Sequence, residues 1–163
     1  MALGIEIVPR FLKRDRERVG VVTEGFPWIG QNTSERIGVL KQKAQQVAAL
    51  YRRGQIEEYE KNAKEIYGLL REAWERAVEE VLFNNSIKRF SHEIKTKNLK
   101  NLWGLNQTIL IRLENGMAKS SRWLTGHDSP ILAVETIPDA NELESDILEL
   151  ESWVKEVRQH HHH

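Results

Sequence analysis

The chain has 163 residues, a length typical of one domain, since domains usually hold about 100–200 residues. Its 24 basic and 24 acidic residues and its mean hydropathy of −0.54 favour a soluble, helix-rich protein. The absence of cysteine excludes disulfides, thiolate zinc sites and cysteine nucleophiles. No apolar run reaches the roughly 18 residues of a membrane span, and no secretory signal is evident, so we expect a cytoplasmic location without membrane contact.

The neutral total conceals four blocks of alternating net charge. The net charge is +5 over residues 1–53, −4 over 54–82, +6 over 83–126 and −7 over 127–159. Blocks of opposite sign can pair within one fold or across a dimer. A basic block that stays uncovered can instead form a local basic face.

Residues 1–33 show no helical periodicity and are predicted to form an irregular N-terminal arm. Apolar residues near 5–8 and at Val21-Val22 are expected to form short extended pieces. Prolines at 9 and 27 keep these pieces short.

Two amphipathic stripes predict an antiparallel helical hairpin over residues 34–83. Apolar residues recur every three or four positions from Ile37 to Tyr51 and again from Ile56 to Ala77. Gly54 leaves only a short connection between the two stripes, so the helices should fold back on each other. Thr33 or Ser34 is expected to cap the first helix with its hydroxyl group.

The second half of the chain contains two further helical patterns. Residues 87–96 alternate as in a short extended segment, whereas residues 101–124 and 139–158 return to helical spacing. The patterns predict an all-α fold, a helical bundle or short coiled coil over residues 34–159, with only minor extended segments. Residues 160–163 are four histidines and are interpreted as a purification tag remnant.

Common catalytic motifs are missing from the sequence. It contains no phosphate-binding GxxxxGK[ST] loop, no GxGxxG, no HExxH and no GxSxG. Outside the terminal histidines only His92 and His127 remain, and protein zinc sites usually need three or four ligands. We therefore expect neither a metal nor a cofactor. The acidic residues of the last helix are expected to form a solvated face.

Arg122 and His127 form the sharpest candidate catalytic pair. Their spacing resembles the R-x4–6-H motif of the HEPN family, all-helical domains that often cut RNA as dimers. A histidine can transfer a proton at the ribose hydroxyl or the leaving oxygen, and an arginine can stabilise charge on the phosphate. Gly126 also suits a helix end, where both cations would simply complement the helix dipole.

A second candidate site is a basic stretch with aromatic neighbours, which would hold phosphates and stack bases. Its predicted nucleic-acid-binding residues are Lys88, Arg89, Lys95, Lys97 and Lys100. The alternative is a solvated face, or one covered by the acidic block.

Three stretches resemble a known class of protein. They are LREAWERAVEEVLFN (70–84), GMAKSSRWLTGHD (116–128) and IPDANELESDILELESWVKEVR (137–158). Together they resemble the C-terminal helical region of large bacterial AAA-family ATPases with an ABC/SMC-like head, many from phage-defence or restriction-linked loci. The resemblance implies a helical domain separate from the ATPase motifs. It carries no active-site residue onto this chain.

The leading hypothesis is a non-catalytic helical interaction module of such an ATPase, with the ATPase head or a second copy of the chain, in a homodimer, as its partner. The first alternative is a metal-independent HEPN-type ribonuclease that uses Arg122 and His127. The second is a nucleic-acid-binding module that uses residues 88–100.

Overall fold

The structure is a computed structural model that describes residues 10–13, 21–24, 27–88, 91–123 and 136–161. The chain divides into two compact units, residues 1–32 and 33–163. In the first unit, strands β1 (Arg10–Lys13) and β2 (Val21–Glu24) pair antiparallel, and a 3-10 turn, η1 (Trp28–Gly30), follows. The extended piece expected near residues 5–8 lies outside the described residues.

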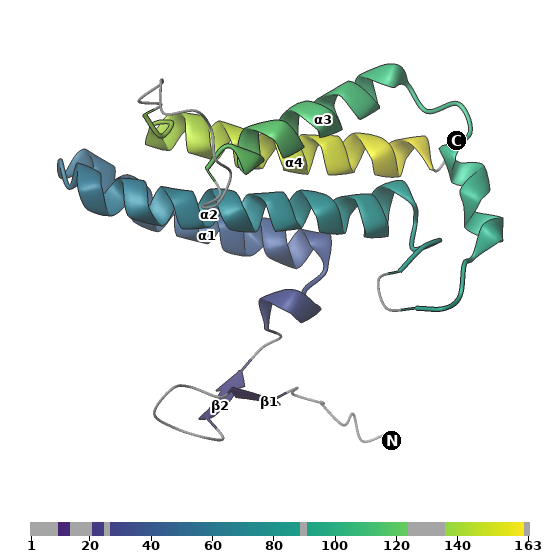
Figure 1. Cartoon of the computed structure of the whole chain (residues 1–163), viewed down its shortest axis with the longest axis horizontal. Coiled ribbons are helices and arrows are strands. Elements are labelled where there is room, and N and C mark those ends of the chain that lie inside the picture. Colours follow the sequence, from purple (N-terminus) through teal and green to yellow (C-terminus); the bar gives the residue numbers. More distant parts are fainter. Residues whose placement is uncertain (1–9, 14–20, 25–26, 89–90, 124–135, 162–163) are drawn as a thin grey trace, which may run out of the picture. The chain divides into compact units, whose positions relative to one another are not determined.

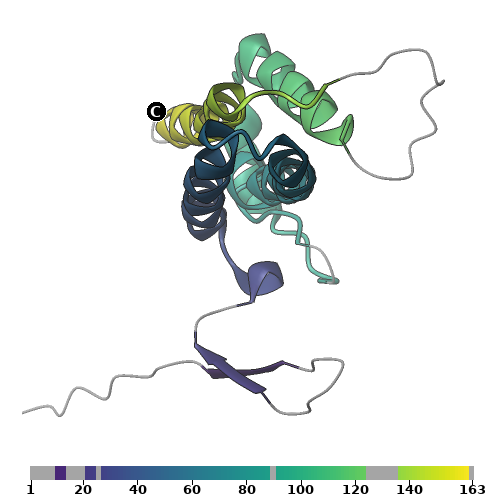
Figure 2. The same ribbon diagram turned by 90° about the vertical axis from the view of Figure 1, so that its left-hand side faces the viewer.

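The second unit is a helical bundle, which confirms the predicted all-α fold. Its described part holds four α-helices: α1 (Thr33–Arg52), α2 (Ile56–Ala77), α3 (Gln107–Ser121) and α4 (Ala140–His160). Successive helices run in opposite directions, so the bundle is up-down-up-down (Figure 1). Seen end-on, α1 packs against α2 and α4, and α3 packs against the same two helices (Figure 2).

The predicted antiparallel hairpin is formed by α1 and α2. Gly54 adopts a φ of 74° in the turn, a left-handed conformation that glycine reaches without a steric penalty. Beyond α2 the chain continues as one turn of π-helix, η2 (Val78–Leu82). The helical segment thus ends at Leu82, close to the predicted residue 83.

Most of the apolar stripes of α1, α2 and α4 are buried within a single chain. The buried stripe of α4 is Leu143, Ile147, Leu150, Val154 and Val157. In the same core the rings of Trp74 and Trp153 meet edge to face with centroids 5.3 Å apart. The Trp153 indole N–H donates a 2.8 Å hydrogen bond to the Ile109 carbonyl, which joins α4 to α3.

The N-terminus of α1 is held by a residue distant in sequence. The backbone N–H and the hydroxyl of Thr33 both donate to Oε2 of Glu80, at 2.9 and 3.1 Å. Sequence reasoning expected a hydroxyl of Thr33 or Ser34 to accept from the helix amides. Instead Thr33 is the first helical residue, and a carboxylate on η2 supplies the acceptor.

The extended segment expected over residues 87–96 forms no strand among the residues that the structure describes. Residues 87–88 and 91–95 belong to no strand or helix, and the chain then forms a 3-10 helix, η3 (Thr96–Leu102). The segment is fixed by local bonds: the Lys95 N–H donates to the Ser86 carbonyl, and the Asn98 side-chain amide donates to the Asn84 carbonyl. Consequently α3 begins at Gln107 and not at residue 101.

Candidate functional site

The described lysines of the predicted nucleic-acid site lie on the connector between α2 and α3. Lys88, Lys95, Lys97 and Lys100 are all exposed, and none forms an ion pair with another described residue. Arg89 lies outside the described residues. The four cations are therefore brought to one segment of the bundle, at the end of α2.

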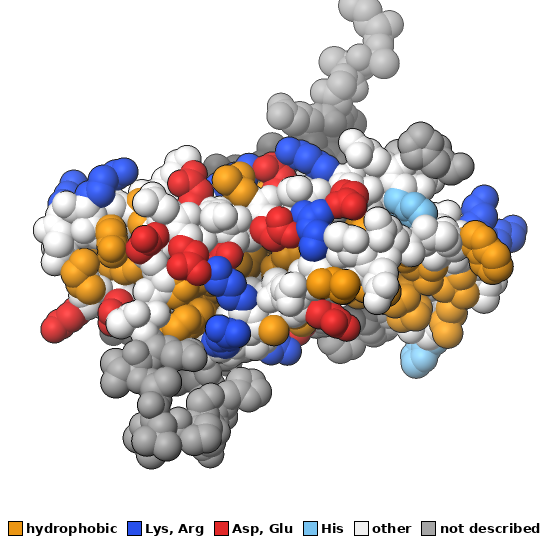
Figure 3. Space-filling view, turned by 90° about the horizontal axis from the view of Figure 1, so that it is seen from above, with side chains coloured by type: hydrophobic (Ala, Val, Ile, Leu, Met, Phe, Trp, Pro, Cys, Tyr) orange, Lys and Arg blue, Asp and Glu red, His pale blue; other side chains and the backbone are white. Residues whose placement is uncertain are grey.

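Large apolar side chains are exposed on the same segment. The exposed fractions are 47% for Ile87, 59% for Ile94, 38% for Leu99 and 89% for Trp103. By contrast, Trp74 and Trp153 are almost fully buried. Figure 3 shows hydrophobic side chains gathered at this end of the bundle. We call these four apolar residues, with the four lysines, the connector surface.

The acidic residues of α4 form ion pairs with basic side chains on other helices and not with the lysines of the connector surface. Their partners on other helices are Lys41 on α1 and Arg112 and Lys119 on α3, and Glu151 also pairs with Lys155 on α4. The ion pairs are Glu151–Lys41 (2.8 Å), Glu142–Lys119 (2.7 Å), Asp146–Lys119 (2.8 Å), Glu149–Arg112 (2.6 Å) and Glu156–Arg112. The described acidic residues of α4 thus pair with α1 and α3, through carboxylates of which Glu142, Glu149 and Glu156 keep 40–51% of their side chains exposed.

A cavity of about 650 Å³ lies at the opposite end of the bundle. Its walls come from the α1–α2 turn, the end of α3 and the start of α4, and they include the rings of Tyr51, Tyr59 and Trp123. Because α2 has 22 residues and rises roughly 1.5 Å per residue, the cavity and the connector surface are separated by about 30 Å.

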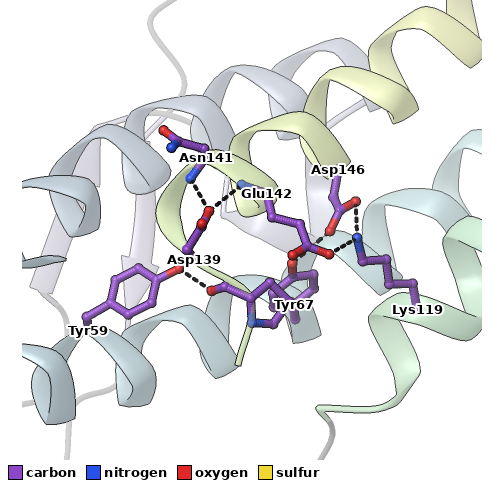
Figure 4. A network of polar contacts seen from close by, with 8 residues as sticks. Tyr59, Tyr67, Lys119, Asp139, Asn141, Glu142 and Asp146 are labelled. Carbon is purple, nitrogen blue, oxygen red and sulfur yellow. Dashed lines mark hydrogen bonds and ion pairs between the residues drawn. The ribbon is translucent and has the colours of Figure 1, made fainter. Parts of the chain in front are cut away.

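A polar network forms the floor of the cavity (Figure 4). The Tyr59 hydroxyl donates to the Pro138 carbonyl at 2.6 Å. Oδ1 of Asp139 accepts the N–H groups of Asn141 and Glu142, both at 2.9 Å, and so caps α4. These bonds tie the first turn of α4 to α2.

The network continues through a second tyrosine (Figure 4). The Tyr67 hydroxyl donates to Oδ2 of Asp146 at 2.7 Å, while Lys119 binds the other oxygen of Asp146 and also Glu142. Burial, followed by the bond to Asp146, raises the pKa of Tyr67 well above its usual range. Burial, followed by the charge of Asp139, raises the pKa of Tyr59 in the same direction. Both phenols are therefore neutral donors.

The predicted catalytic pair is only half described. Arg122 follows the last residue of α3, is exposed, and lines the cavity. His127 lies outside the described residues, so the approach of the two side chains stays a prediction. Among the described residues no cluster of three or more His, Asp or Glu could hold a metal.

Sequence reasoning did not find the tyrosine network or the exposure of Trp103. Tyr59 belonged to the apolar stripe of α2, and nothing in that stripe distinguishes a tyrosine that reaches a backbone carbonyl across the bundle. The only sequence feature that pointed to Trp103 was its position close to the lysines of the basic stretch.

The comparisons with known proteins give no relative. No family model, no curated protein and no solved structure matches the chain. In the part of the chain that the structure describes, no helix is long and apolar enough to cross a membrane.

Proposed function

We propose that this chain is a helical interaction module and that its contact surface is the connector surface. The observation that carries the proposal is Trp103, which exposes 89% of its surface on a connector that also carries three other exposed apolar residues. Exposed clusters of large apolar side chains mark contact sites, and tryptophan is among the residues that contribute most to binding. The likeness to AAA-family ATPases supports a place for this module in a longer ATPase chain.

The partner that fits this surface best is single-stranded nucleic acid. The four exposed lysines have no acidic partner among the described residues, so their charge is available to phosphates. An exposed indole offers a face on which a base can stack, and such stacking contributes about 1–3 kcal/mol per base. Two copies of the same surface would instead bring lysines against lysines, which disfavours self-association through it.

A binding titration with a short oligothymidylate tests the proposal. Replacement of Lys95 and Lys97 by glutamine should weaken binding and make the negative slope of log K against log salt less steep by about 1.4, since each phosphate contact on a single strand contributes roughly −0.7. The matched control replaces Lys61 and Lys64, an exposed pair on α2. Equal effects of the two double variants, or no binding by the unaltered chain, would refute the nucleic-acid assignment.

Self-association is the second candidate, supported by a different surface. Most of the apolar stripes are already buried within one chain, but Leu110 and Ile111 on α3 are 43% and 48% exposed. A homodimer would cover this face of α3. The solution mass over a range of concentrations tests the idea: Leu110→Lys with Ile111→Lys should abolish any dimer, and a monomer at every concentration would exclude it.

A further inference from the structure

We propose that the cavity between the α1–α2 turn, α3 and α4 binds a small organic cation of the quaternary or methylated ammonium class. This inference is independent of the connector surface, which lies at the other end of the bundle. A volume of about 650 Å³ is within the usual range for small-molecule sites, roughly 300–1,000 Å³. The choice of a cation follows from the aromatic rings and the charges of the walls.

Aromatic side chains supply one part of the recognition. Tyr51 and Tyr59 meet edge to face with ring centroids 5.0 Å apart, and Trp123 lines the cavity from the turn that follows α3. The face of an aromatic ring attracts a cation, most strongly when the cation carries little hydration. The Trp123 ring packs against Tyr67 with centroids 6.2 Å apart, and its indole nitrogen is buried without a hydrogen-bond partner among the described residues.

Carboxylates supply the other part. Glu60 lines the cavity and forms no ion pair with another described residue. Asp139 caps α4 through Oδ1 alone, which leaves its second oxygen to face other groups. Lys119 lines the cavity too, but Glu142 and Asp146 both bind its ammonium group. The charge that remains at the floor is therefore negative.

These carboxylates also act on the phenol of Tyr59. After burial, the charges of Asp139, Glu142 and Glu60 all contribute to raising the pKa of its phenol. The start of α4 does not attract an anion either, because the Asp139 carboxylate already accepts its first free N–H groups. Arg122 also lines the cavity, and its positive charge should repel a bound cation. Removal of that charge should therefore strengthen the binding of a cation.

The experiment compares choline with its neutral isostere, in which carbon replaces the charged nitrogen. Binding is followed by the NMR shift of the Trp123 indole N–H, assigned with Trp123→Phe. Choline should bind roughly tenfold more tightly than the isostere, as expected for a cation held against aromatic rings. Equal binding of the two compounds, or no saturable shift with choline, would overturn the proposal, and this comparison needs only the unaltered chain.

Three variants then test the individual walls. Glu60→Gln should weaken choline binding, whereas Arg122→Gln should strengthen it, because these changes remove charges of opposite sign. Tyr51→Leu should weaken binding more than Tyr51→Phe, which keeps the ring. If Glu60→Gln and Arg122→Gln shift the affinity in the same direction while both variants keep the helical circular dichroism of the unaltered chain, the electrostatic argument is wrong.

Discussion

The indole of Trp74 on α2 lies directly against Gly116 on α3. A Cβ atom on residue 116 would lie 2.5 Å from two carbons of the Trp74 ring, far inside normal contact. Along α3 only Ile109 and Ser120 are buried. The close approach at Gly116 therefore adds a direct packing contact between α3 and α2.

Gly116→Ala should destabilise the bundle by about 1–3 kcal/mol, because the added methyl group must displace the Trp74 indole. Alanine favours a helix by roughly 1 kcal/mol over glycine, so steric and helical effects oppose each other here. Gly38→Ala on α1 is the matched control: nothing lies within 4 Å of its added Cβ, and it should stabilise the protein. Urea denaturation measures both. A Gly116→Ala variant as stable as Gly38→Ala would contradict the packing described.

Glu80→Ala should lower the free energy of unfolding by about 1–2 kcal/mol, the usual effect of losing a helix cap. The variant leaves the N–H and hydroxyl of Thr33 without their acceptor. Glu114→Ala removes an exposed acid from the middle of α3 and should change stability by less than about 0.5 kcal/mol. If the two variants unfold at the same denaturant concentration, Glu80 does not hold α1.

Alkaline pH should destabilise the bundle through Tyr59 and Tyr67. Both pKa values are raised above the ordinary 10.0, chiefly by burial. Below pH 10 the phenols are neutral in both states, so the folded chain keeps their full contribution. Above pH 10 the unfolded chain releases these protons while the folded chain retains them, and stability falls as pH rises.

Two of the three tyrosines should therefore ionise only as the helices unfold, so that their phenolate absorbance rises together with the loss of helical circular dichroism. Tyr67→Phe cannot ionise at this position, so its stability should decline less steeply above pH 10. Ionisation of all three tyrosines while the helices remain intact would contradict the burial of the two phenols.

The helices were predictable because their signals are local and periodic. Leu143, Ile147 and Leu150 follow each other at helical spacing, and all three are buried in α4. Asp139 immediately precedes α4 and caps it, because its carboxylate can accept hydrogen bonds from the first free N–H groups of the helix. The antiparallel hairpin followed from Gly54, whose left-handed conformation permits a short turn.

The failures concern contacts between distant segments. The cap on Thr33 comes from Glu80, 47 positions away, and no local pattern predicts it. The alternation over residues 87–96 was misleading because alternating polarity produces a strand only when a partner strand offers hydrogen bonds. Here the backbone of Lys95 bonds to Ser86 instead. Whether the basic stretch is exposed or covered could not be decided from the sequence, and the exposure of Lys95, Lys97 and Trp103 became visible only in the fold.

The emission of Trp103 during titration with oligothymidylate tests the central claim most directly. Trp103 is nearly fully exposed, so stacking of a base on it should quench fluorescence, and Trp103→Phe should remove that quenching while it leaves the signal of the buried tryptophans. Quenching that saturates at low salt and disappears as salt rises is the predicted result. Unchanged emission at low salt, in the presence of excess oligonucleotide, would contradict the assignment of the connector surface as a nucleic-acid contact.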